Sequence, residues 1–137
     1  MPRSVKVRSS VLRAMLAHAR NTWPQECCGL LAGNNGVISE ILPAPNALAS
    51  ATEYSIAPAE LVAAFRSLRG RGLAHLGIYH SHPQGTNEPS RRDIDMAWYP
   101  SCVYFIISPR ASARTLRAFE IRDGKVSELE IQPEFVD

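Results

Sequence analysis

Two histidines and one aspartate, His80, His82 and Asp93, have the residue types and spacing of a metal site. In an extended strand, side chains two positions apart leave the same face, so the imidazoles of His80 and His82 can reach one ion. Asp93 adds a carboxylate from the first turn of a helix that we expect to begin at Ser90. Two nitrogens and one carboxylate leave a tetrahedral zinc ion one open position for water, which is typical of catalytic sites. Such an ion lowers the pKa of water to about 7, so hydroxide is available at neutral pH.

Each part of this pattern also has a simpler explanation. A His-x-His pair occurs by chance in polar loops, and Ser90 followed by Asp93 can be a helix capping box. Capping and metal binding are compatible, because one oxygen of a carboxylate can serve each purpose. His18 and His75 have no partner at metal spacing, and we interpret them as surface residues or as histidines with ordinary hydrogen bonds.

The elements that must position these residues follow from the hydrophobic pattern. Polar and apolar residues alternate over 4–8, which predicts a strand with one buried face. Ser9 or Ser10 is expected to cap the next helix, and Pro58 suits the first turn of another. The pattern predicts strands over 4–8, 27–33, 37–42, 54–56, 73–82, 102–108, 115–122 and 126–132, and helices over 9–22, 58–68 and 90–99.

This order of elements predicts an α/β fold, with a mixed β-sheet flanked by helices in a single domain over 1–137. Asn35-Gly36 and Asp123-Gly124 are hairpin turn signals. The very apolar strand 102–108 is expected to be central, although the pattern does not give the order of the strands. The inner face of the second helix is expected to carry Leu61, Val62, Phe65 and Leu68.

Composition narrows the class of protein. The chain has 137 residues, 45% of them hydrophobic and 20% charged, as is ordinary for a globular domain. The net charge of +2 and scattered basic residues give no nucleic-acid face, and no apolar run is long enough to span a membrane. Three cysteines, Cys27, Cys28 and Cys102, do not form a disulfide framework, so we expect reduced thiols in a cytoplasmic protein. The sequence indicates no oligomeric state.

Residues 80–93 resemble the motif of a known family, the JAMM/MPN metallopeptidases. Two histidines flank Ser81, seven residues precede Ser90, and two more separate Ser90 from Asp93, which matches the motif without a gap. Glu26 precedes a Cys-Cys-Gly-Leu-Leu run that is similar to the glutamate-bearing segment of the family. The resemblance covers nearly the whole chain, and its compact length is similar to that of stand-alone bacterial and archaeal members.

The resemblance implies a fold, a cofactor and a role for each residue of the motif. The fold would be the JAMM/MPN form of the cytidine-deaminase-like sandwich, and the cofactor one zinc ion per chain with a catalytic water. His80, His82 and Asp93 match the zinc ligands of the family. Glu26 matches the general acid/base, which moves a proton from water to the departing amine. Ser90 matches the serine that helps to stabilise the oxyanion.

The resemblance also implies a class of substrate. Known members cleave peptide or isopeptide bonds after the C-terminal Gly-Gly of ubiquitin or of ubiquitin-like small proteins, which in bacteria are sulfur carriers. Few residues separate Asp93 from the strand at Cys102, so the insertion with which eukaryotic relatives grip a second ubiquitin is expected to be absent. The loop 43–57, which contains Tyr54, is expected to flank the substrate tail.

Two other classes of function compete with this interpretation. A non-catalytic MPN-type scaffold that binds protein partners would have lost one or more motif residues, whereas all five are present here. Among other zinc hydrolases, a metallo-β-lactamase-like site would need an Asp-His pair where this chain has Pro83-Gln84-Gly85. A nucleobase deaminase would need a Cys-x-x-Cys pair, which this chain lacks.

Overall fold

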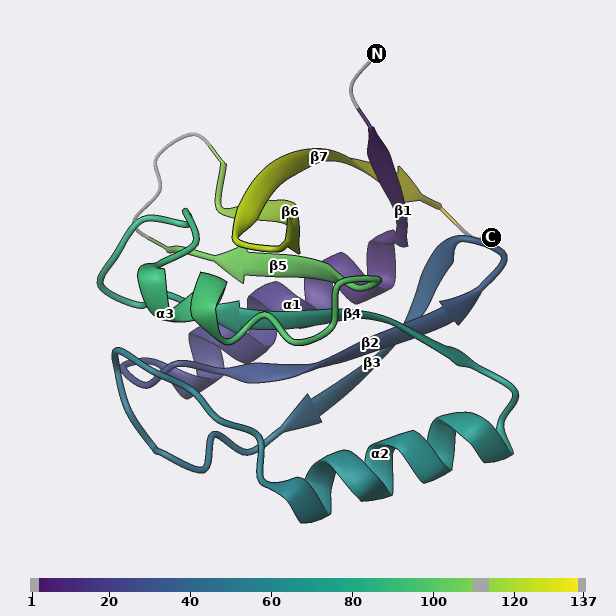
Figure 1. Cartoon of the computed structure of the whole chain (residues 1–137), viewed down its shortest axis with the longest axis horizontal. Helices are drawn as coiled ribbons and strands as arrows, with labels where there is room; N and C mark the ends of the chain where they lie inside the picture. Colours follow the sequence, from purple (N-terminus) through teal and green to yellow (C-terminus); the bar gives the residue numbers. More distant parts are fainter. Residues whose placement is uncertain (1–2, 110–113, 136–137) are drawn as a thin grey trace.

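Seven strands and three helices form in residues 3–109 and 114–135, which are the residues that the computed structural model of the chain describes (Figure 1). In chain order they are β1 (Ser4–Arg8), α1 (Ser9–Thr22), β2 (Cys28–Asn34), β3 (Val37–Ala44), α2 (Pro58–Gly70), β4 (Ala74–Ser81), α3 (Arg91–Asp95), β5 (Val103–Ile107), β6 (Leu116–Arg122) and β7 (Lys125–Glu134). The predicted mixed sheet flanked by helices is confirmed. No helix in these residues is long and apolar enough to cross a membrane.

The strands lie in the order β1-β3-β2-β4-β5-β6-β7, and β1 closes the sheet by pairing with both β3 and β7. Strand β4 pairs antiparallel with β2 and parallel with β5. A parallel pair needs a crossover connection, and here the connection contains α3. The two faces of β4 are therefore covered by different elements, and its C-terminal end opens beside the loops on either side of α3 (Figure 1).

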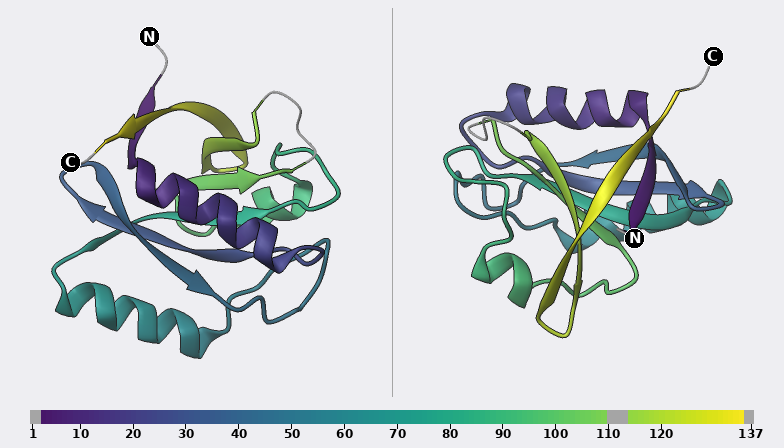
Figure 2. Two further views of the ribbon diagram at one scale, coloured as in Figure 1. Left: turned by 180° about the vertical axis from the view of Figure 1, so that it is seen from behind. Right: turned by 90° about the horizontal axis from the view of Figure 1, so that it is seen from above.

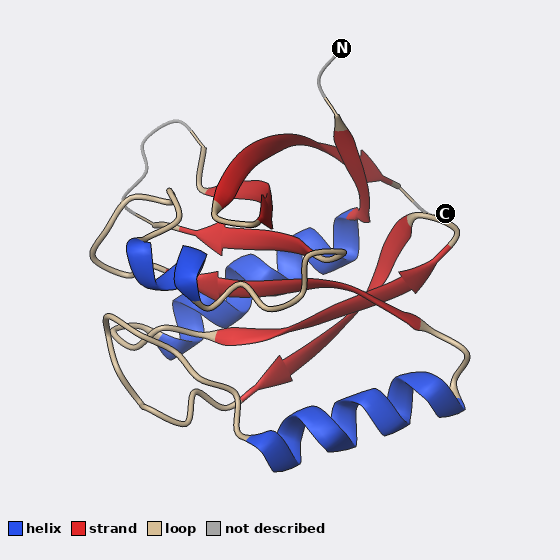
Figure 3. Cartoon of the chain, viewed as in Figure 1, coloured by secondary structure: helices blue, strands red, loops and turns tan. Residues whose placement is uncertain are grey.

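Apolar side chains pack on both faces of the sheet. Helix α1 lies across one face, where it buries Val11, Met15 and Ala19 against the strands. Helix α3 lies on the opposite face, as the view from above in Figure 2 shows, and α2 packs Leu61 and Phe65 into the core of that face. Figure 3 shows the three helices around the sheet. Each face of the sheet has its own hydrophobic core. Because side chains alternate along β4, Tyr79 packs in the core beneath α1 and Ile78 in the core on the opposite face.

The two hairpin turns are confirmed, and their backbone conformations explain the residues that form them. Asn35 and Gly36 have φ angles of 55° and 75°, and Asp123 and Gly124 have φ angles of 51° and 77°. Positive φ at both central residues is typical of the type I′ turn, which matches the twist of the flanking strands. Asn, Asp and Gly are the residues that adopt this conformation at least cost.

Three local predictions were wrong. Residues 54–56 form no strand, and both backbone groups of Ser55 bond within the loop, to Asn46 and to Ala47. The helix expected over 90–99 ends at Asp95, and Tyr99 turns back to donate its amide to the Tyr104 hydroxyl. Neither Ser9 nor Ser10 caps α1, because the N-cap position is Arg8, which follows directly from strand β1.

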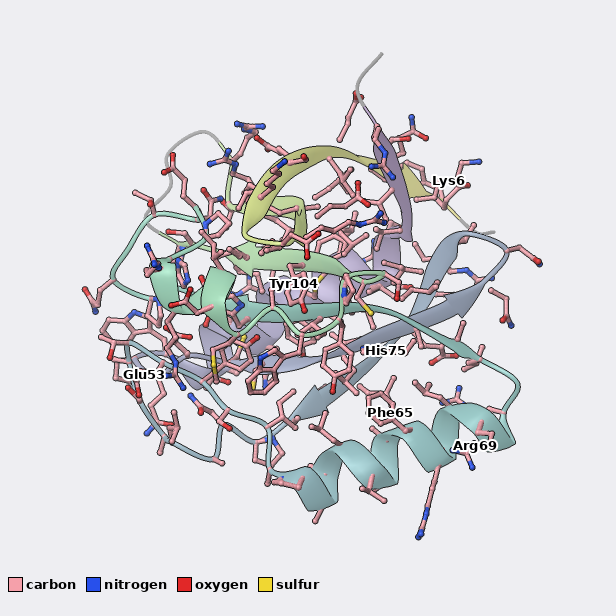
Figure 4. All side chains as sticks on the ribbon, in the orientation of Figure 1. Lys6, Glu53, Phe65, Arg69, His75 and Tyr104 are labelled. Carbon is pink, nitrogen blue, oxygen red and sulfur yellow. The ribbon has the colours of Figure 1, made fainter. Side chains whose placement is uncertain are left out.

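Fewer residues of α2 face the sheet than predicted. Val62 is 50% exposed, whereas Leu61 and Phe65 pack on the sheet and Leu68 is buried. In Figure 4, Phe65 points from α2 toward the sheet and lies beside His75, with 5.1 Å between the ring centroids. The position of Val62 on the helix places it beside this stripe rather than on it.

Candidate metal centre

The C-terminal end of β4 holds the two histidines in the middle of the sheet. His80 pairs with Cys28 of β2 on one side and with Ile106 of β5 on the other. The strand ends at Ser81, and the amide of His82 still donates to the carbonyl of Ile107 at 2.8 Å. The backbone of His80 is therefore held by strands on both sides, and that of His82 by β5.

The structure brings His80, His82 and Asp93 together. The Nε2 atom of His80 lies 3.0 Å from Nε2 of His82 and 3.1 Å from Oδ1 of Asp93, and Nε2 of His82 lies 3.0 Å from Oδ2 of Asp93. One ligand atom from each residue thus faces a common point, and all three lie within 4.8 Å of one another. Zinc in proteins is commonly bound by imidazole nitrogens and carboxylate oxygens, so this set of two imidazoles and one carboxylate fits zinc.

A backbone contact fixes the ring of His82. Its Nδ1 atom lies 2.6 Å from the carbonyl oxygen of Thr86, which can only accept, so Nδ1 carries the proton. The lone pair of the neutral ring is then on Nε2, the atom that faces the cluster, as is usual for metal-binding histidines. The loop is held in turn because Asn87 donates to the carbonyl of Arg114 and Ser108 donates to that of Gly85.

Asp93 is positioned by the start of α3. Its amide donates to Ser90 Oγ at 3.1 Å, and its Oδ2 accepts from the amide of Ser90 at 2.9 Å, so the predicted capping box is present. The same carboxylate faces both histidines, so capping and the metal cluster share it. The start of the short helix α3 therefore sets the direction of this side chain.

The charges in the cluster are compatible with binding a metal ion. Burial would raise the pKa of Asp93, but its contacts with the imidazoles of His80 and His82 outweigh burial and hold the pKa far below its ordinary value. Burial lowers the pKa of His80, which favours the neutral ring. Burial also opposes charge on His82, yet its contacts with Asp93 and Thr86 raise the pKa of His82. These pKa shifts keep Asp93 ionised and favour the neutral ring of His80.

Glu26 lies at the same end of the sheet, two residues before the ladder between β2 and β4 begins at Cys28. Cys27 and Ser81 exchange two bonds: the amide of Cys27 donates to Ser81 Oγ at 2.8 Å, and the amide of Ser81 donates to the Cys27 carbonyl at 3.1 Å. Because Cys28 pairs with His80, continuing this register places Glu26 opposite His82. Directly opposed residues of an antiparallel pair point to the same face.

Burial controls the charge of Glu26, which is 4% exposed. Desolvation raises the pKa of its carboxyl to about 8, with Asp93 adding to the effect and His82 opposing it. A general acid/base works best when its pKa is near the operating pH. A cation held by the cluster would lower this pKa, because an opposite charge favours the ionised form.

Two contributors to the site were missed in the sequence. Ser81 bonds to Cys27 from a position 54 residues away, and no local signal indicates such a partner. Tyr54, which was expected only to flank the substrate, stacks on His80 with 4.5 Å between the ring centroids and 24° between the planes. Its ring covers one side of the imidazole and keeps water from that side.

A cleft of about 100 Å³ opens beside the cluster. Asp93 of the cluster and Tyr54, which stacks on His80, both lie in its wall. Arg92 on α3 and Glu53 on the facing loop lie 3.9 Å apart at their charged ends, and Figure 4 shows Glu53 at the same edge as α3. The rest of the wall is mainly apolar, with Leu30, Ile56, Leu61, Ile78, Met96, Trp98 and Tyr99.

Known proteins resemble this chain over most of its length. The family described as prokaryotic homologs of the JAB domain matches residues 8–122. A CysO-cysteine peptidase of Mycobacterium tuberculosis is 36% identical over 125 residues, which is 89% of this chain and 86% of the relative. A desampylase of Haloferax volcanii is 32% identical over 125 residues, covering 88% of this chain and 90% of the relative.

Solved structures agree with this assignment. A protein of Desulfitobacterium hafniense superimposes with a TM-score of 0.86 and 32% identity, covering 96% of this chain and 94% of that one. The match by sequence and by fold includes the strand that carries His80 and the helix that carries Asp93. This chain therefore belongs to the prokaryotic JAB family, in agreement with the JAMM/MPN resemblance of its histidine motif.

Proposed function

We propose that this chain hydrolyses the peptide or isopeptide bond that follows the C-terminal Gly-Gly of a ubiquitin-like or sulfur-carrier protein. The observation that carries the proposal is the cluster of His80, His82 and Asp93 beside the buried carboxyl of Glu26. Relatives named CysO-cysteine peptidase and desampylase support it, because their names describe the removal of small-protein conjugates.

The proposed mechanism gives each residue of the chain one task. His80, His82 and Asp93 would hold zinc, which when bound supplies a Lewis acid that polarises a carbonyl and lowers the pKa of water. Glu26 accepts a proton from the attacking water and donates it to the departing amine. Ser90 donates its hydroxyl proton toward the oxyanion, since its Oγ accepts from the amide of Asp93 and is still free to donate.

The cleft beside Asp93 is the proposed path of the substrate tail. Its apolar wall suits side chains of an extended segment, and its polar edge lies at the cluster. An apolar cavity of about 150 Å³ is known to hold benzene, so a smaller cleft has room for roughly one side chain. The scissile bond would then lie at the end of this cleft, between Glu26 and Ser90.

The direct test is incubation of the purified protein with ubiquitin-like proteins that end in Gly-Gly and carry a C-terminal extension or a lysine conjugate. Mass spectrometry should find a cut directly after Gly-Gly that 1,10-phenanthroline blocks and serine- or cysteine-protease reagents do not. A protein that binds these partners but cleaves none of them would instead be the non-catalytic MPN-type scaffold.

Replacing Ser90 with alanine should lower kcat by about 10²–10³-fold, the cost of one oxyanion donor. The change also removes the cap of α3, which contributes about 1 kcal/mol. Ser90→Thr keeps a hydroxyl that can both cap and donate, so it should retain most of the turnover. Equal losses in both variants, measured as kcat, would contradict a role for the hydroxyl.

Replacing Met96 with aspartate should raise KM about tenfold, because a charge would replace an apolar contact in the cleft worth roughly 1.5 kcal/mol. Met96 lies in the cleft wall, whereas Val62 is an exposed residue of α2 that does not. Val62→Asp is therefore the matched control and should leave KM unchanged. An unchanged KM in Met96→Asp would rule out this cleft as the path of the tail.

A further inference from the structure

The loop between β3 and α2 has no strand or helix, yet one side chain organises it. The side-chain nitrogen of Asn46, Nδ2, donates to the carbonyls of Glu53 at 2.9 Å and Ser50 at 3.5 Å. Its Oδ1 accepts from the amides of Leu48 at 3.1 Å and Ser55 at 3.2 Å. Both ends of the side chain are thus used, and the loop folds around it.

The same side chain reaches Glu26. Asn46 Nδ2 donates to the main-chain carbonyl of Glu26 at 3.1 Å, and the amide of Glu26 donates to the carbonyl of Ser50 at 2.8 Å. Ser50 is itself one of the groups that Asn46 contacts. The backbone of Glu26 is therefore held on both sides by a loop whose shape depends on Asn46.

This anchor matters because the carboxyl of Glu26 has no anchor of its own. Among the described residues, none donates a hydrogen bond to the side chain of Glu26, although it is buried. A general acid/base must leave its oxygens free to exchange protons, so its position has to come from the backbone. A misplacement of about 1 Å at a reacting group can cost roughly 10²-fold in rate.

We propose that Asn46 is the positioning residue of Glu26: it ties the loop 46–55 to the backbone of Glu26 and so fixes where the carboxyl meets the substrate. The contact spans 20 residues of sequence, and no motif of the metal cluster contains Asn46. Asn46 itself lies in neither the cleft wall nor the cluster, but its partners Glu53 and Ser55 lie in that wall. An effect through the cleft would raise KM, whereas an effect through Glu26 lowers kcat.

The test compares Asn46→Ala with Thr52→Ala, a change in the same loop at a side chain that, among the residues the structure describes, bonds only to Ser50 Oγ. Asn46→Ala should lower kcat about 10–100-fold, leave KM within about threefold and leave the metal content unchanged. Thr52→Ala should change none of the three. A rise in KM, a loss of metal or an equal effect in the control would overturn the proposal.

A double-mutant comparison separates positioning from general loss of structure. If Asn46 acts through Glu26, adding Asn46→Ala to Glu26→Gln should lower the residual turnover by less than about threefold. A general destabilisation would give the full loss again in this background and would overturn the proposal. Should Asn46→Ala fail to fold, Asn46→Asp replaces it, because it keeps the acceptor for Leu48 and Ser55 and loses the donor to Glu26.

The inference rests on the proposed peptidase activity, but one measurement does not depend on turnover. Hydrogen exchange should show the amides of Glu26 and Ser55 losing protection in Asn46→Ala, while that of Ser81 in β4 keeps it. Unchanged protection would reject the anchor even in an active enzyme. If the wild type cleaves nothing while the protection is lost as expected, the proposed activity fails and the anchor remains.

Discussion

Replacing Glu26 with glutamine should lower kcat by about 10²–10⁴-fold and leave zinc bound at about one ion per chain. Glutamine has nearly the same shape but cannot take up and return a proton, so water is no longer activated and the amine leaves unprotonated. The metal should remain because Glu26 is not part of the cluster that His80, His82 and Asp93 form. Single-turnover assays and elemental analysis on the same preparation measure both quantities.

A second consequence of this change can be measured without substrate. Because burial raises the pKa of Glu26 from 4.5 to about 8, the folded metal-free chain binds a proton that the unfolded chain has lost between these values. The stability of the wild type relative to Glu26→Gln should therefore fall as pH rises from about 4.5 to about 8. Melting temperatures of the two metal-free proteins across this range give the slope, and a slope of opposite sign would mean that Glu26 is not buried as described.

Active Glu26→Gln protein would reject the acid/base role, whereas loss of zinc would mean that Glu26 takes part in binding the metal. Glu53→Gln is the matched control, since this exposed-loop carboxylate lies at the same edge and interacts with Arg92. It should retain its kcat, because it lies outside the proton path, and any change should appear in KM, since Glu53 lies in the cleft wall. Equal losses in the two variants would indicate a general effect of charge near the site.

Replacing both His80 and His82 with alanine should remove the bound zinc and all detectable cleavage. Only Asp93 would remain of the three groups that face the common point, and a single carboxylate does not form a zinc site. The wild type should also gain stability on addition of zinc, by about 2.7 kcal/mol at a free zinc concentration of 100 times the Kd. The double variant should gain none, which thermal melting with and without zinc will measure.

His18→Gln is the control for this experiment. His18 lies on the other core face, where its Nδ1 atom is 2.7 Å from the hydroxyl of Tyr79, and it is not part of the cluster. This variant should keep its zinc and its zinc-dependent rise in melting temperature. A double variant of His80 and His82 that retained full zinc would place the metal elsewhere and end the present proposal for the site.

The sequence by itself determined those features that depend on neighbours in the chain. The two-residue period of a strand places His80 and His82 on one face, and the capping box turns Asp93 toward them. The turns at Asn35-Gly36 and at Asp123-Gly124 were predictable for the same reason, since positive φ angles restrict the residue types. In each case the partners lie close together in sequence, so spacing alone carries the geometry.

Tertiary structure decided the features that join distant segments. The closure of the sheet by β1 depends on pairing with both β3 and β7, and hydrophobic alternation indicates which face of a strand is buried but not which strand lies beside it. Residues 54–56 have the composition of a strand, but Asn46 and its partners take up their backbone bonds. Glu26 lies beside the site because Cys28 pairs with His80, and the loop that contains Asn46 and Ser50 bonds to its backbone. These contacts are selected by packing of the whole sheet, and no local pattern records them.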